Sequence, residues 1–461
     1  MKLTKFGKAL WIGALSVGLV LGVTSCVQSY TVGYLYVTGT VTASTGNNGI
    51  ISGYKIDHNT GQLTPINGLP VASGGANPVR AYLTLGSRFL YVLNRGVNGS
   101  GNGNCYGTGA NVCQNASIME FAVGGNGILT PQQAFFSQGF NPFRMFVDTS
   151  GSYLFVLDHD APDNLNPSIN DNCALALGSG VTTCGDITVF KIDQTTGRLS
   201  TVLNQQVTAA NDQPLTYFPV PANPVDFVLS GNSVLTLTGA PPPTSYPYVG
   251  GTEVWPYGYA GSTGQLTLSQ NSVQTLGITQ GTAIVNASSV IYVLDNEPIT
   301  ITSTSPQAQL FKPGVYPSQI LPFTVGTGGA LNAEPGGAVP DWGTVYNPIY
   351  VLATPKFVYL ANQGSDVTGT NNPVSEIVVY ELNSPFQLQF TQDQPFGSGA
   401  GAQCIVEDPT NQFFYEANEI DSTVTGQALD PNSGDLDHLR VLDTYKLEGP
   451  PTWCLVNPRT S

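Results

Sequence analysis

Two arginines and one aspartate stand at equivalent places in three similar segments of the chain. Each segment reads Asn-Pro, then one residue, then a charged residue, which is Arg80, Arg144 or Asp226. Lys and Arg together number only 15, so two arginines at equivalent places are informative. Two guanidinium groups at one level can hold a carboxylate or a phosphate through paired hydrogen bonds. The alternative is that they pair internally with Asp226, Asp148 or Glu407 and only fill the centre of the protein.

A second chemical group is the run Asp158-His159-Asp160, which Asp163 follows closely. A His between two carboxylates gains basicity, because both neighbours favour its protonated form. The same carboxylates offer oxygen ligands of the kind that Ca²⁺ prefers. Capping of a turn at the end of a strand explains Asp158 without any chemistry. The run therefore predicts either a general base at His159 or Asp160, or a weak calcium site at Asp158, Asp160 and Asp163.

The elements that must position these groups are short aromatic strands that recur along the chain. A turn of the form Asp-x-x-Thr-Gly-x-Leu follows at 57–63 and again at 193–199, with weaker versions elsewhere. The Asp can cap such a turn and the Gly can adopt the positive φ that closes it. The seven copies of the aromatic strand lie at 34–37, 89–92, 153–156, 234–237, 290–293, 357–360 and 413–416.

Repeats of this kind predict an all-β fold, a seven-bladed propeller of four-stranded antiparallel blades. In a propeller the strands after the Asn-Pro pairs line the central channel, so Arg80, Arg144 and Asp226 would face one another there. The connections between second and third strands are long at 94–116, 158–185 and 295–318. Long loops on one face favour a binding surface. The alternative is that they only shield the protein from proteases.

The C-terminus supplies the strand that the first repeat lacks. Residues 451–458 resemble 401–408 of the last repeat, so we expect the C-terminal strand to complete the first blade and close the ring, which also removes exposed strand edges. The match aligns Cys454 with Cys404. It predicts a disulfide between the closing strand and the last repeat, at the place where the ring closes, which we call the seam. Two further pairs of cysteines are close in the sequence, and we expect each to form a disulfide within its own loop: Cys105 with Cys113, and Cys173 with Cys184. Metal binding is the rival interpretation, but no Cys-x-x-Cys spacing supports it.

The first residues have the pattern of an export signal. Three lysines precede an apolar stretch at 9–23, which is shorter than a typical transmembrane helix. Val23-Thr24-Ser25-Cys26 then resembles a bacterial lipobox, in which the Cys is acylated and becomes the mature N-terminus. An ordinary signal peptide with an accidental Cys is the alternative. We therefore expect a signal peptide at 1–25, a short tether at 26–33 from lipidated Cys26, and the propeller domain at 34–461.

Composition excludes several classes of protein. Charged residues are only 10% of the chain and hydrophobic residues 41%, so a helix-rich protein with ion-paired helical faces is excluded. There are 15 basic and 30 acidic side chains, and this excess of acidic residues argues against a protein that binds nucleic acid. Asn, Gln, Ser and Thr must make the surface polar. No Gly-rich phosphate loop or Gly-x-Ser-x-Gly elbow is present.

Tyr-Val-Thr at 36–38, the aromatic strands ending near Asn and the Asp-x-x-Thr-Gly-x-Leu turns together resemble the lactonase-type propellers. This family includes bacterial 6-phosphogluconolactonase, relatives of fungal carboxymuconate cyclase and YVTN-repeat surface proteins. The resemblance implies a propeller over nearly the whole mature chain, and it is poor evidence for activity. Enzyme-like members commonly carry a His-rich motif where this chain has 141–151 without histidine. If the chain is a lactonase, a base such as His159 would activate water and Arg80 or Arg144 would stabilise the oxyanion.

The sequence thus predicts a lipid-anchored propeller of the bacterial cell envelope, at the outer membrane and facing either the periplasm or the exterior. We expect a monomeric module that binds a small molecule or an envelope protein; the alternatives are a lactone hydrolase and a structural envelope component. We expect no nucleic-acid partner and no cofactor apart from the weak calcium alternative. The predicted catalytic residues are Arg80, Arg144, His159 and Asp160, and the predicted binding residues are Asp148, Asp158, Asp226 and Glu407.

Overall fold

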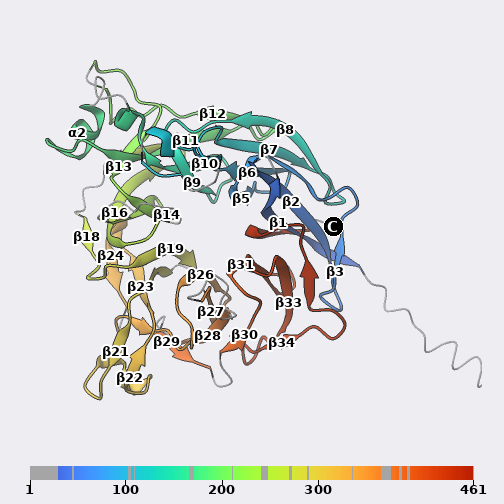
Figure 1. The fold of residues 1–461 in the computed structure, drawn as a ribbon. Helices are drawn as coiled ribbons and strands as arrows, with labels where there is room; N and C mark the ends of the chain where they lie inside the picture. Colours follow the sequence, from blue (N-terminus) through green and yellow to red (C-terminus); the bar gives the residue numbers. More distant parts are fainter. Residues whose placement is uncertain are drawn as a thin grey trace, which may run out of the picture.

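A computed structural model describes residues 30–459, except 44–45, 102–104, 108, 166–170, 210, 240–247, 269–272, 288–289, 335, 365–374, 384–386 and 392–394. The expected signal peptide, Cys26 and the first half of the expected tether lie outside the described residues. The strands form antiparallel sheets arranged around a common axis, like the blades of a propeller (Figure 1). None of the helices in the described part of the chain is long and apolar enough to cross a membrane.

The sheet at the chain ends combines N-terminal and C-terminal strands. Its order is β3-β2-β1-β36, and β4 also pairs with β2. The C-terminal strand therefore completes this sheet, which confirms the predicted closure of the ring. The strands are β1 (Thr31–Ala43), β2 (Gly46–Asp57), β3 (Leu63–Pro65), β4 (Val71–Ala76) and β36 (Pro451–Pro458). Since β1 begins at Thr31, the last residues of the interval expected as a tether are strand.

Two further sheets follow along the chain, and both carry a disulfide-stapled loop between their second and third strands. The four-stranded sheet contains β5 (Pro78–Leu83), β6 (Phe89–Asn94), β7 (Ser117–Val123) and β8 (Leu129–Phe135). The next contains β9 (Phe140–Val147), β10 (Tyr153–Asp160), β11 (Cys184–Ile192), β12 (Leu199–Thr201) and β13 (Phe218–Pro221). Their loops include the short helices η1 (Gly109–Asn111), η2 (Pro162–Leu165) and α2 (Asp171–Leu177).

The middle of the chain forms one continuous ten-stranded sheet. Its first half contains β14 (Pro224–Ser230), β15 (Ser233–Gly239), β16 (Gly251–Ala260), β17 (Gln265–Leu268) and β18 (Gln274–Thr275). Its second half contains β19 (Gly281–Ala287), β20 (Val290–Asp295), β23 (Gln319–Val325), β24 (Leu331–Ala333) and β25 (Val339–Pro340). The loop after β20 carries a separate hairpin of β21 (Ile299–Ile301) and β22 (Gly314–Tyr316), with the short helix η3 (Pro306–Gln309), and η4 (Thr327–Gly329) precedes β24.

Two five-stranded sheets complete the ring. One contains β26 (Pro348–Ala353), β27 (Phe357–Asn362), β28 (Glu376–Asn383), β29 (Gln387–Phe390) and β30 (Phe396–Gly397). The other contains β31 (Ala402–Glu407), β32 (Phe413–Asn418), β33 (Thr423–Leu429), β34 (Leu436–His438) and β35 (Thr444–Lys446). The three long connections expected from the sequence, after β6, β10 and β20, are all present.

The prediction of seven separate four-stranded blades is wrong. The described strands form five separate blades of four or five strands, together with the ten-stranded sheet and the small hairpin. The two halves of the ten-stranded sheet join where Gly251 of β16 pairs with Gly281 of β19. A Cβ atom on Gly281 would lie 2.6 Å from the Gly251 carbonyl oxygen, so only glycine permits this approach. A repeat pattern counts strands but does not show which backbone edges pair, and this is why the count failed.

The aromatic strands and the Asp-x-x-Thr-Gly turns are two halves of one contact between neighbouring sheets. The Tyr415 hydroxyl of β32 donates to the Gly61 carbonyl at 2.7 Å, and the Tyr36 hydroxyl of β1 donates to the Gly127 carbonyl at 2.7 Å. Tyr91 makes the same contact with Gly197. In the 57–61 turn Asp57 Oδ1 accepts the backbone N–H of Thr60 at 2.9 Å, and Gly61 has a φ of 67°. Each turn therefore presents a carbonyl to the buried tyrosine of the sheet beside it.

All three predicted disulfides are present. Cys105 bonds Cys113, Cys173 bonds Cys184, and Cys404 bonds Cys454. However, Cys404 and Cys454 are not equivalent in register, because Trp453 occupies the position after the bulge in β36 and Cys454 comes one residue later. Side chains alternate between the two faces of a strand. Equivalent positions in successive inner strands would point the same way, so the offset of one residue is what turns the two sulfur atoms toward each other.

We predict that the Cys404–Cys454 disulfide at the seam contributes more to the free energy of unfolding than a disulfide within a single loop does. Replacing both Cys404 and Cys454 by Ser should lower the free energy of unfolding by about 4 kcal/mol, because the bond closes a separation of 50 residues. The matched double variant of Cys105 and Cys113 opens a separation of only 8 residues and should cost about 2.5 kcal/mol. Urea unfolding followed by tyrosine and tryptophan fluorescence measures both. Equal losses would contradict the role assigned to the seam.

Candidate functional site

The inner strands enclose a cavity of about 280 Å³ on the axis of the ring. Its walls come from β5, β9, β14, β19, β26 and β36, so six inner strands contribute. Each of these strands has a register shift just after its start. In each of these six strands the residue after the shift is among those that line the cavity. We call these positions the bulge layer; its members in the wall are Arg80, Arg144, Asp226, Ala283, Tyr350 and Trp453.

Arg144 and Asp226 form a buried ion pair in the bulge layer. Arg144 Nε lies 3.0 Å from Asp226 Oδ1, and another guanidinium nitrogen of Arg144 donates to the Phe143 carbonyl at 3.3 Å. Asp226 also accepts the backbone N–H of Phe227 at 2.9 Å and that of Ile284 at 3.1 Å. The three donors hold the carboxylate firmly. Internal pairing, the alternative considered for the arginines, is thus what the structure shows for Arg144.

Arg80 has a different environment at the same level. Its guanidinium carbon lies 4.1 Å from the centre of the Trp453 ring, and Nη1 donates to the Val79 carbonyl at 2.7 Å. Tyr350 contacts the Trp453 ring edge to face, with 5.3 Å between ring centres. Burial raises the pKa of the Tyr350 phenol to about 12, so this side chain is a neutral hydrogen-bond donor at neutral pH. Stacking on an aromatic ring holds a guanidinium in place, and a guanidinium carries five N–H donors in a planar array.

His159 and Asp160 lie together, but away from this cavity. His159 Nδ1 is 3.0 Å from Asp160 Oδ2, and the buried imidazole stacks on Tyr248 with 4.1 Å between ring centres. Neither His159 nor Asp160 is among the residues that line the cavity. The Phe143 ring lies 6.3 Å from the His159 ring and 5.4 Å from the Arg144 guanidinium. The structure therefore does not bring the predicted base and the predicted arginines into one site.

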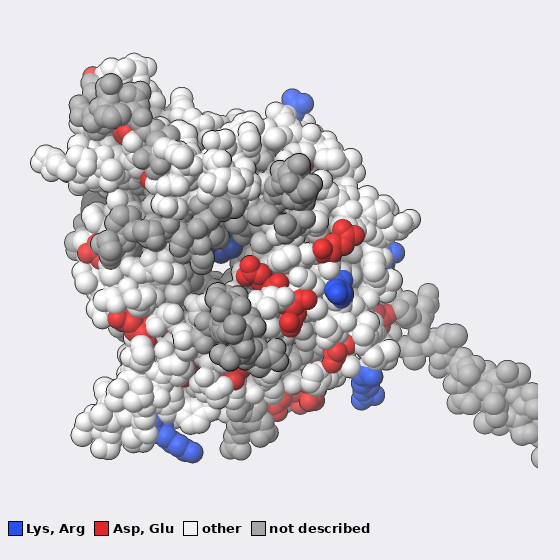
Figure 2. Space-filling model, in the orientation of Figure 1, with Lys and Arg blue, Asp and Glu red and all other residues white. Residues whose placement is uncertain are grey.

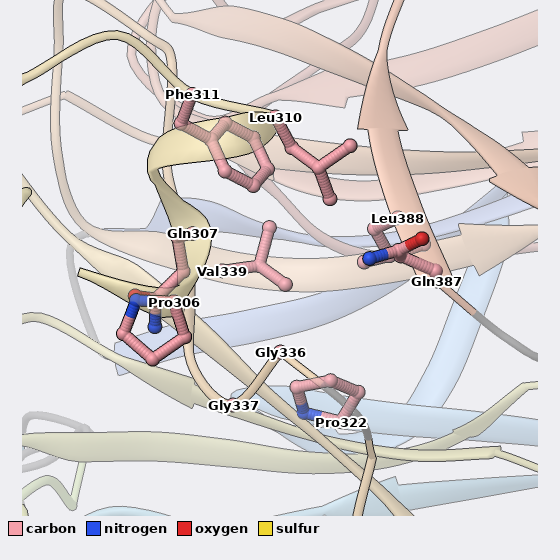
Figure 3. A pocket seen from close by; sticks show the side chains of 10 residues that line it. All are labelled: Pro306, Gln307, Leu310, Phe311, Pro322, Gly336, Gly337, Val339, Gln387 and Leu388. Atoms are coloured by element: carbon pink, nitrogen blue, oxygen red, sulfur yellow. The ribbon is translucent and has the colours of Figure 1, made fainter. Parts of the chain in front are cut away.

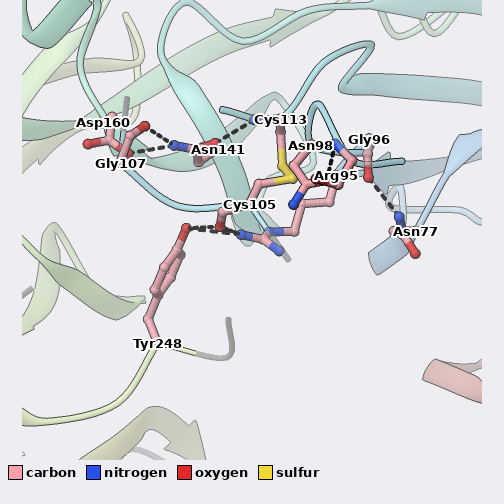
Figure 4. Close-up of a disulfide and its surroundings, with 11 residues drawn as sticks. Asn77, Arg95, Gly96, Asn98, Cys105, Gly107, Cys113, Asn141, Asp160 and Tyr248 are labelled. Carbon is pink, nitrogen blue, oxygen red and sulfur yellow. Dashed lines mark hydrogen bonds between the residues drawn. A yellow bond between two sulfur atoms is a disulfide. The ribbon is translucent and has the colours of Figure 1, made fainter. Parts of the chain in front are cut away.

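The loop closed by the Cys105–Cys113 disulfide packs beside Asn141, Asp160 and Tyr248 (Figure 4). Asn141 anchors it, because its side-chain oxygen accepts the backbone N–H of Cys113 at 2.8 Å and its amide donates to Asp160 Oδ2 at 2.6 Å. Tyr248 donates from its hydroxyl to the Cys105 carbonyl at 3.0 Å. Asn141 has a φ of 59°, a conformation that Asn tolerates better than most residues. The Asn of this Asn-Pro pair thus has two roles: it adopts the positive φ at the start of the inner strand, and its side chain holds the disulfide-bonded loop.

The remaining predicted binding residues, Asp148 and Glu407, lie at or just after the C-terminal ends of the inner strands β9 and β31. Asp148 caps the turn after β9, where its Oδ1 accepts the backbone N–H of Ser152 and of Tyr153, both at 2.8 Å. Asp148 also accepts the Tyr259 hydroxyl at 3.0 Å. Glu407 ends β31, and burial raises the pKa of its carboxyl group. Neither residue is among those that line the cavity.

The three acids of the suggested calcium site face separate partners. Asp158 Oδ1 accepts the Ser137 hydroxyl at 2.7 Å, and Asp163 Oδ1 accepts the Tyr217 hydroxyl at 2.7 Å. Asp160 bonds His159 and Asn141, as described above. Within the described ranges no group of three or more His, Cys, Asp or Glu side chains has an arrangement that could hold a metal ion. The carboxylates therefore do not converge as calcium ligands must.

Asp158 and Asp186 form a buried acidic pair that the sequence did not reveal. They lie directly opposite each other on β10 and β11, and both are 0% exposed. The Thr188 hydroxyl lies 3.4 Å from Asp158 Oδ2 and 3.3 Å from Asp186 Oδ1. Burial raises the pKa of both carboxyl groups, and the charge of Asp158 raises that of Asp186 further. Two adjacent carboxyls that are both fully buried are expected to retain a proton.

Sequence reasoning also missed the aromatic wall of the cavity. Tyr82, Phe146, Tyr350 and Trp453 all line it. Tyr350 was detectable, since it follows Asn347-Pro348 at the same spacing that places Arg80 after Asn77-Pro78. Trp453 was hidden because alignment of the cysteines shifted the closing strand by one residue. The space-filling view shows the hollow at the centre of the ring with a basic side chain beside it and acidic side chains on the surrounding surface (Figure 2).

Two other hollows are less suited to ligands. The one between the helix η3 and strand β29 has apolar walls that include Leu310, Phe311 and Leu388, but a volume of only about 20 Å³ (Figure 3). That volume holds about one water molecule. A broad groove of about 1000 Å³ lies at the outer edge between the 59–62 turn and residues 437–441, away from the bulge layer. The central cavity is therefore the candidate site.

We predict that the Asp158–Asp186 pair makes stability fall as pH rises. The raised pKa values mean that the folded state holds a proton which the unfolded state releases near pH 4. This contribution is complete below the unfolded pKa and is lost as pH rises toward the folded value. The free energy of unfolding of the wild type should therefore fall between pH 5 and pH 8. In Asp158→Asn this fall should be smaller by at least about 1 kcal/mol. Urea unfolding at both pH values measures the difference, and the exposed Asp437→Asn variant should behave like the wild type.

The comparisons with known proteins support the fold. No family model and no curated protein matches the chain. A periplasmic gluconolactonase from Pseudomonas aeruginosa has 15% identity and a TM-score of 0.60, over 93% of this chain and 100% of that one. A putative 6-phosphogluconolactonase from Bacteroides fragilis has 12% identity and a TM-score of 0.60, over 92% and 98%. A protein from Lactobacillus plantarum has 16% identity and a TM-score of 0.58, over 93% and 99%. The chain thus has the fold of the 6-phosphogluconolactonase-like β-propellers.

Proposed function

We propose that this protein binds a small organic anion in its central cavity, with Arg80 as the contact for the negative charge. The observation that carries the proposal is the position of Arg80, in a cavity wall and stacked on Trp453 at 4.1 Å. Among the described residues that line the cavity, Arg80 and Arg144 are basic and only Asp226 is acidic. The bulge layer therefore has an excess of positive charge, which attracts an anion in a protein that is otherwise strongly acidic.

Binding is a better fit than catalysis for two reasons. First, no histidine is among the described residues that line the cavity, so His159 does not belong to its wall. Second, Asp226 already accepts hydrogen bonds from Arg144, Phe227 and Ile284. A general base must reach the proton that it removes, and here the carboxylate faces its own donors.

Lactone hydrolysis is the second candidate, and one feature favours it. The Arg144–Asp226 pair stands in the wall of the same cavity as Arg80. A lactone carbonyl beside Arg80 would develop negative charge that the guanidinium stabilises, while Asp226 orients the attacking water. The solved gluconolactonases that resemble this chain are similar in fold, and at 12–15% identity their activity does not transfer to it.

We propose that the protein acts outside the cytoplasm, attached to the outer membrane through acylated Cys26. Three disulfides are typical of exported proteins, and one protein of similar fold is described as periplasmic. The acyl chains would hold the propeller at the membrane without a spanning helix.

The anion site predicts a specific loss of binding in Arg80→Met. Isothermal titration with gluconate, butyrate and octanoate as probes should detect binding of at least one carboxylate to the wild type. The variant should bind that carboxylate at least tenfold more weakly, since a charge-assisted hydrogen bond contributes roughly 1.5–3 kcal/mol. The matched control is Arg440→Met on the exposed outer edge, which should bind like the wild type. If all three proteins bind alike, the anion contact lies elsewhere.

A pH-stat assay with a panel of sugar-acid lactones separates the two candidate functions. The binding proposal predicts no turnover above background. Turnover that disappears in Arg144→Ala, with the fold retained by circular dichroism, would establish the hydrolase instead. Asp226→Asn should then also be inactive, because the same carboxylate is assigned to the water.

The membrane attachment predicts a change of fraction on loss of the acylated residue. Wild-type protein should incorporate labelled fatty acid and sediment with membranes. Cys26→Ser should do neither, because the acyl acceptor is gone. Labelling that persists in the variant would show that Cys26 is not the acylated residue.

A further inference from the structure

The cavity contains a second layer of side chains beneath the bulge layer. Because side chains alternate along a strand, the residue two places further faces the same way and lies roughly 6.6 Å further along the axis. In the cavity wall this layer is Tyr82, Phe146, Val228 and Val285. The corresponding residues of the other inner strands are Leu352, Val406 and Leu455. We call this set the apolar layer, since no charged residue or amide occurs in it.

The two layers differ sharply in what they offer a ligand. The bulge layer offers the guanidinium of Arg80 and the neutral Tyr350 phenol at the edge of Trp453. The apolar layer offers aromatic and β-branched surface; the Phe146 ring stacks on Phe155 at 4.8 Å and contacts Phe227 at 4.4 Å, so it is firmly held. Polar side chains return only beyond this layer, where Thr149 and Asn286 are exposed at the rim.

A polyhydroxylated ligand does not suit this arrangement. Each hydroxyl of a sugar acid that leaves water needs a hydrogen-bond partner, and an unmade bond costs roughly 1–3 kcal/mol. The apolar layer has only the Tyr82 hydroxyl to offer, and Asp226 above it is held by three protein donors. A ligand with an anionic head and an apolar body would instead match both layers at once.

We propose that the ligand of this cavity is an amphiphilic carboxylate, with its head at Arg80 and a short hydrocarbon body against the apolar layer. This inference rests on the proposed anion site and specifies the chemical class that the site accepts. The cavity of about 280 Å³ is at the small end of the range for small-molecule sites, roughly 300–1,000 Å³. A medium-chain carboxylate is therefore a better fit than a long lipid.

The test is a chain-length series measured by isothermal titration on the purified full-length protein. Butyrate, hexanoate and octanoate are the amphiphilic probes, and gluconate is the polar probe. Burial of each added methylene should tighten binding about fourfold, until the cavity is full. Octanoate should therefore bind more tightly than butyrate, and gluconate should bind no more tightly than butyrate.

Variants in the apolar layer locate the effect. The double variant Val228→Thr with Val285→Thr keeps side-chain size but adds two hydroxyls, so it should weaken octanoate binding about tenfold and change butyrate binding by less than twofold. Val325→Thr, on strand β23 and absent from the cavity wall, is the matched control and should bind octanoate like the wild type. Circular dichroism checks that each variant is folded.

The outcomes separate this inference from the proposed function. If gluconate binds at least as tightly as octanoate, or affinity does not change with chain length, the anion site stands and the amphiphile inference is overturned. If no carboxylate binds, the anion site itself fails and the inference fails with it. Octanoate binding that is unchanged in both Arg80→Met and the double Val variant would show adsorption to another surface, which also overturns the inference.

Discussion

Closure of the ring is the constraint on which the site depends. Strand β36 pairs with β1, so the last residues of the chain complete the first sheet and the two ends are held by backbone hydrogen bonds. The Cys404–Cys454 bond adds a covalent tie to the neighbouring inner strand. Trp453 enters the cavity wall only through this strand, and Arg80 stacks on Trp453. An open ring would lose both the wall and the support for the guanidinium.

Contacts between neighbouring sheets then set the spacing around the ring. The tyrosine at the centre of one sheet donates to the glycine carbonyl in a turn of the next sheet, as Tyr415 does to Gly61 and Tyr36 to Gly127. Each such bond contributes roughly 0.5–1.5 kcal/mol, and burial keeps the phenol neutral by raising its pKa. These bonds also explain a protein with so few charged residues, since neutral tyrosines and backbone carbonyls make the contacts between blades.

The cavity shows how the regular repeat produces a graded environment. The register shift near the start of each inner strand places Arg80, Arg144 and Asp226 at one level, and alternation along the strand places Phe146 and Val228 at the next. Charge is thus concentrated at one depth and hydrocarbon at another. The fold is shared with proteins named as gluconolactonases, whereas the chemistry that this cavity supports is set by the residues at these two levels.

The sequence by itself determined the β-propeller class, the closure by the C-terminal strand, the three disulfides and the common level of Arg80, Arg144 and Asp226. These follow from local repetition and spacing, which a single chain displays directly. Only the tertiary structure decided that β16 and β19 join in one sheet, that Trp453 rather than Cys454 occupies the bulge layer, and that His159 lies outside the cavity wall that the two arginines share. The physical reason is that edge pairing, a register offset of one residue and the packing between sheets depend on backbone positions that no repeat pattern encodes.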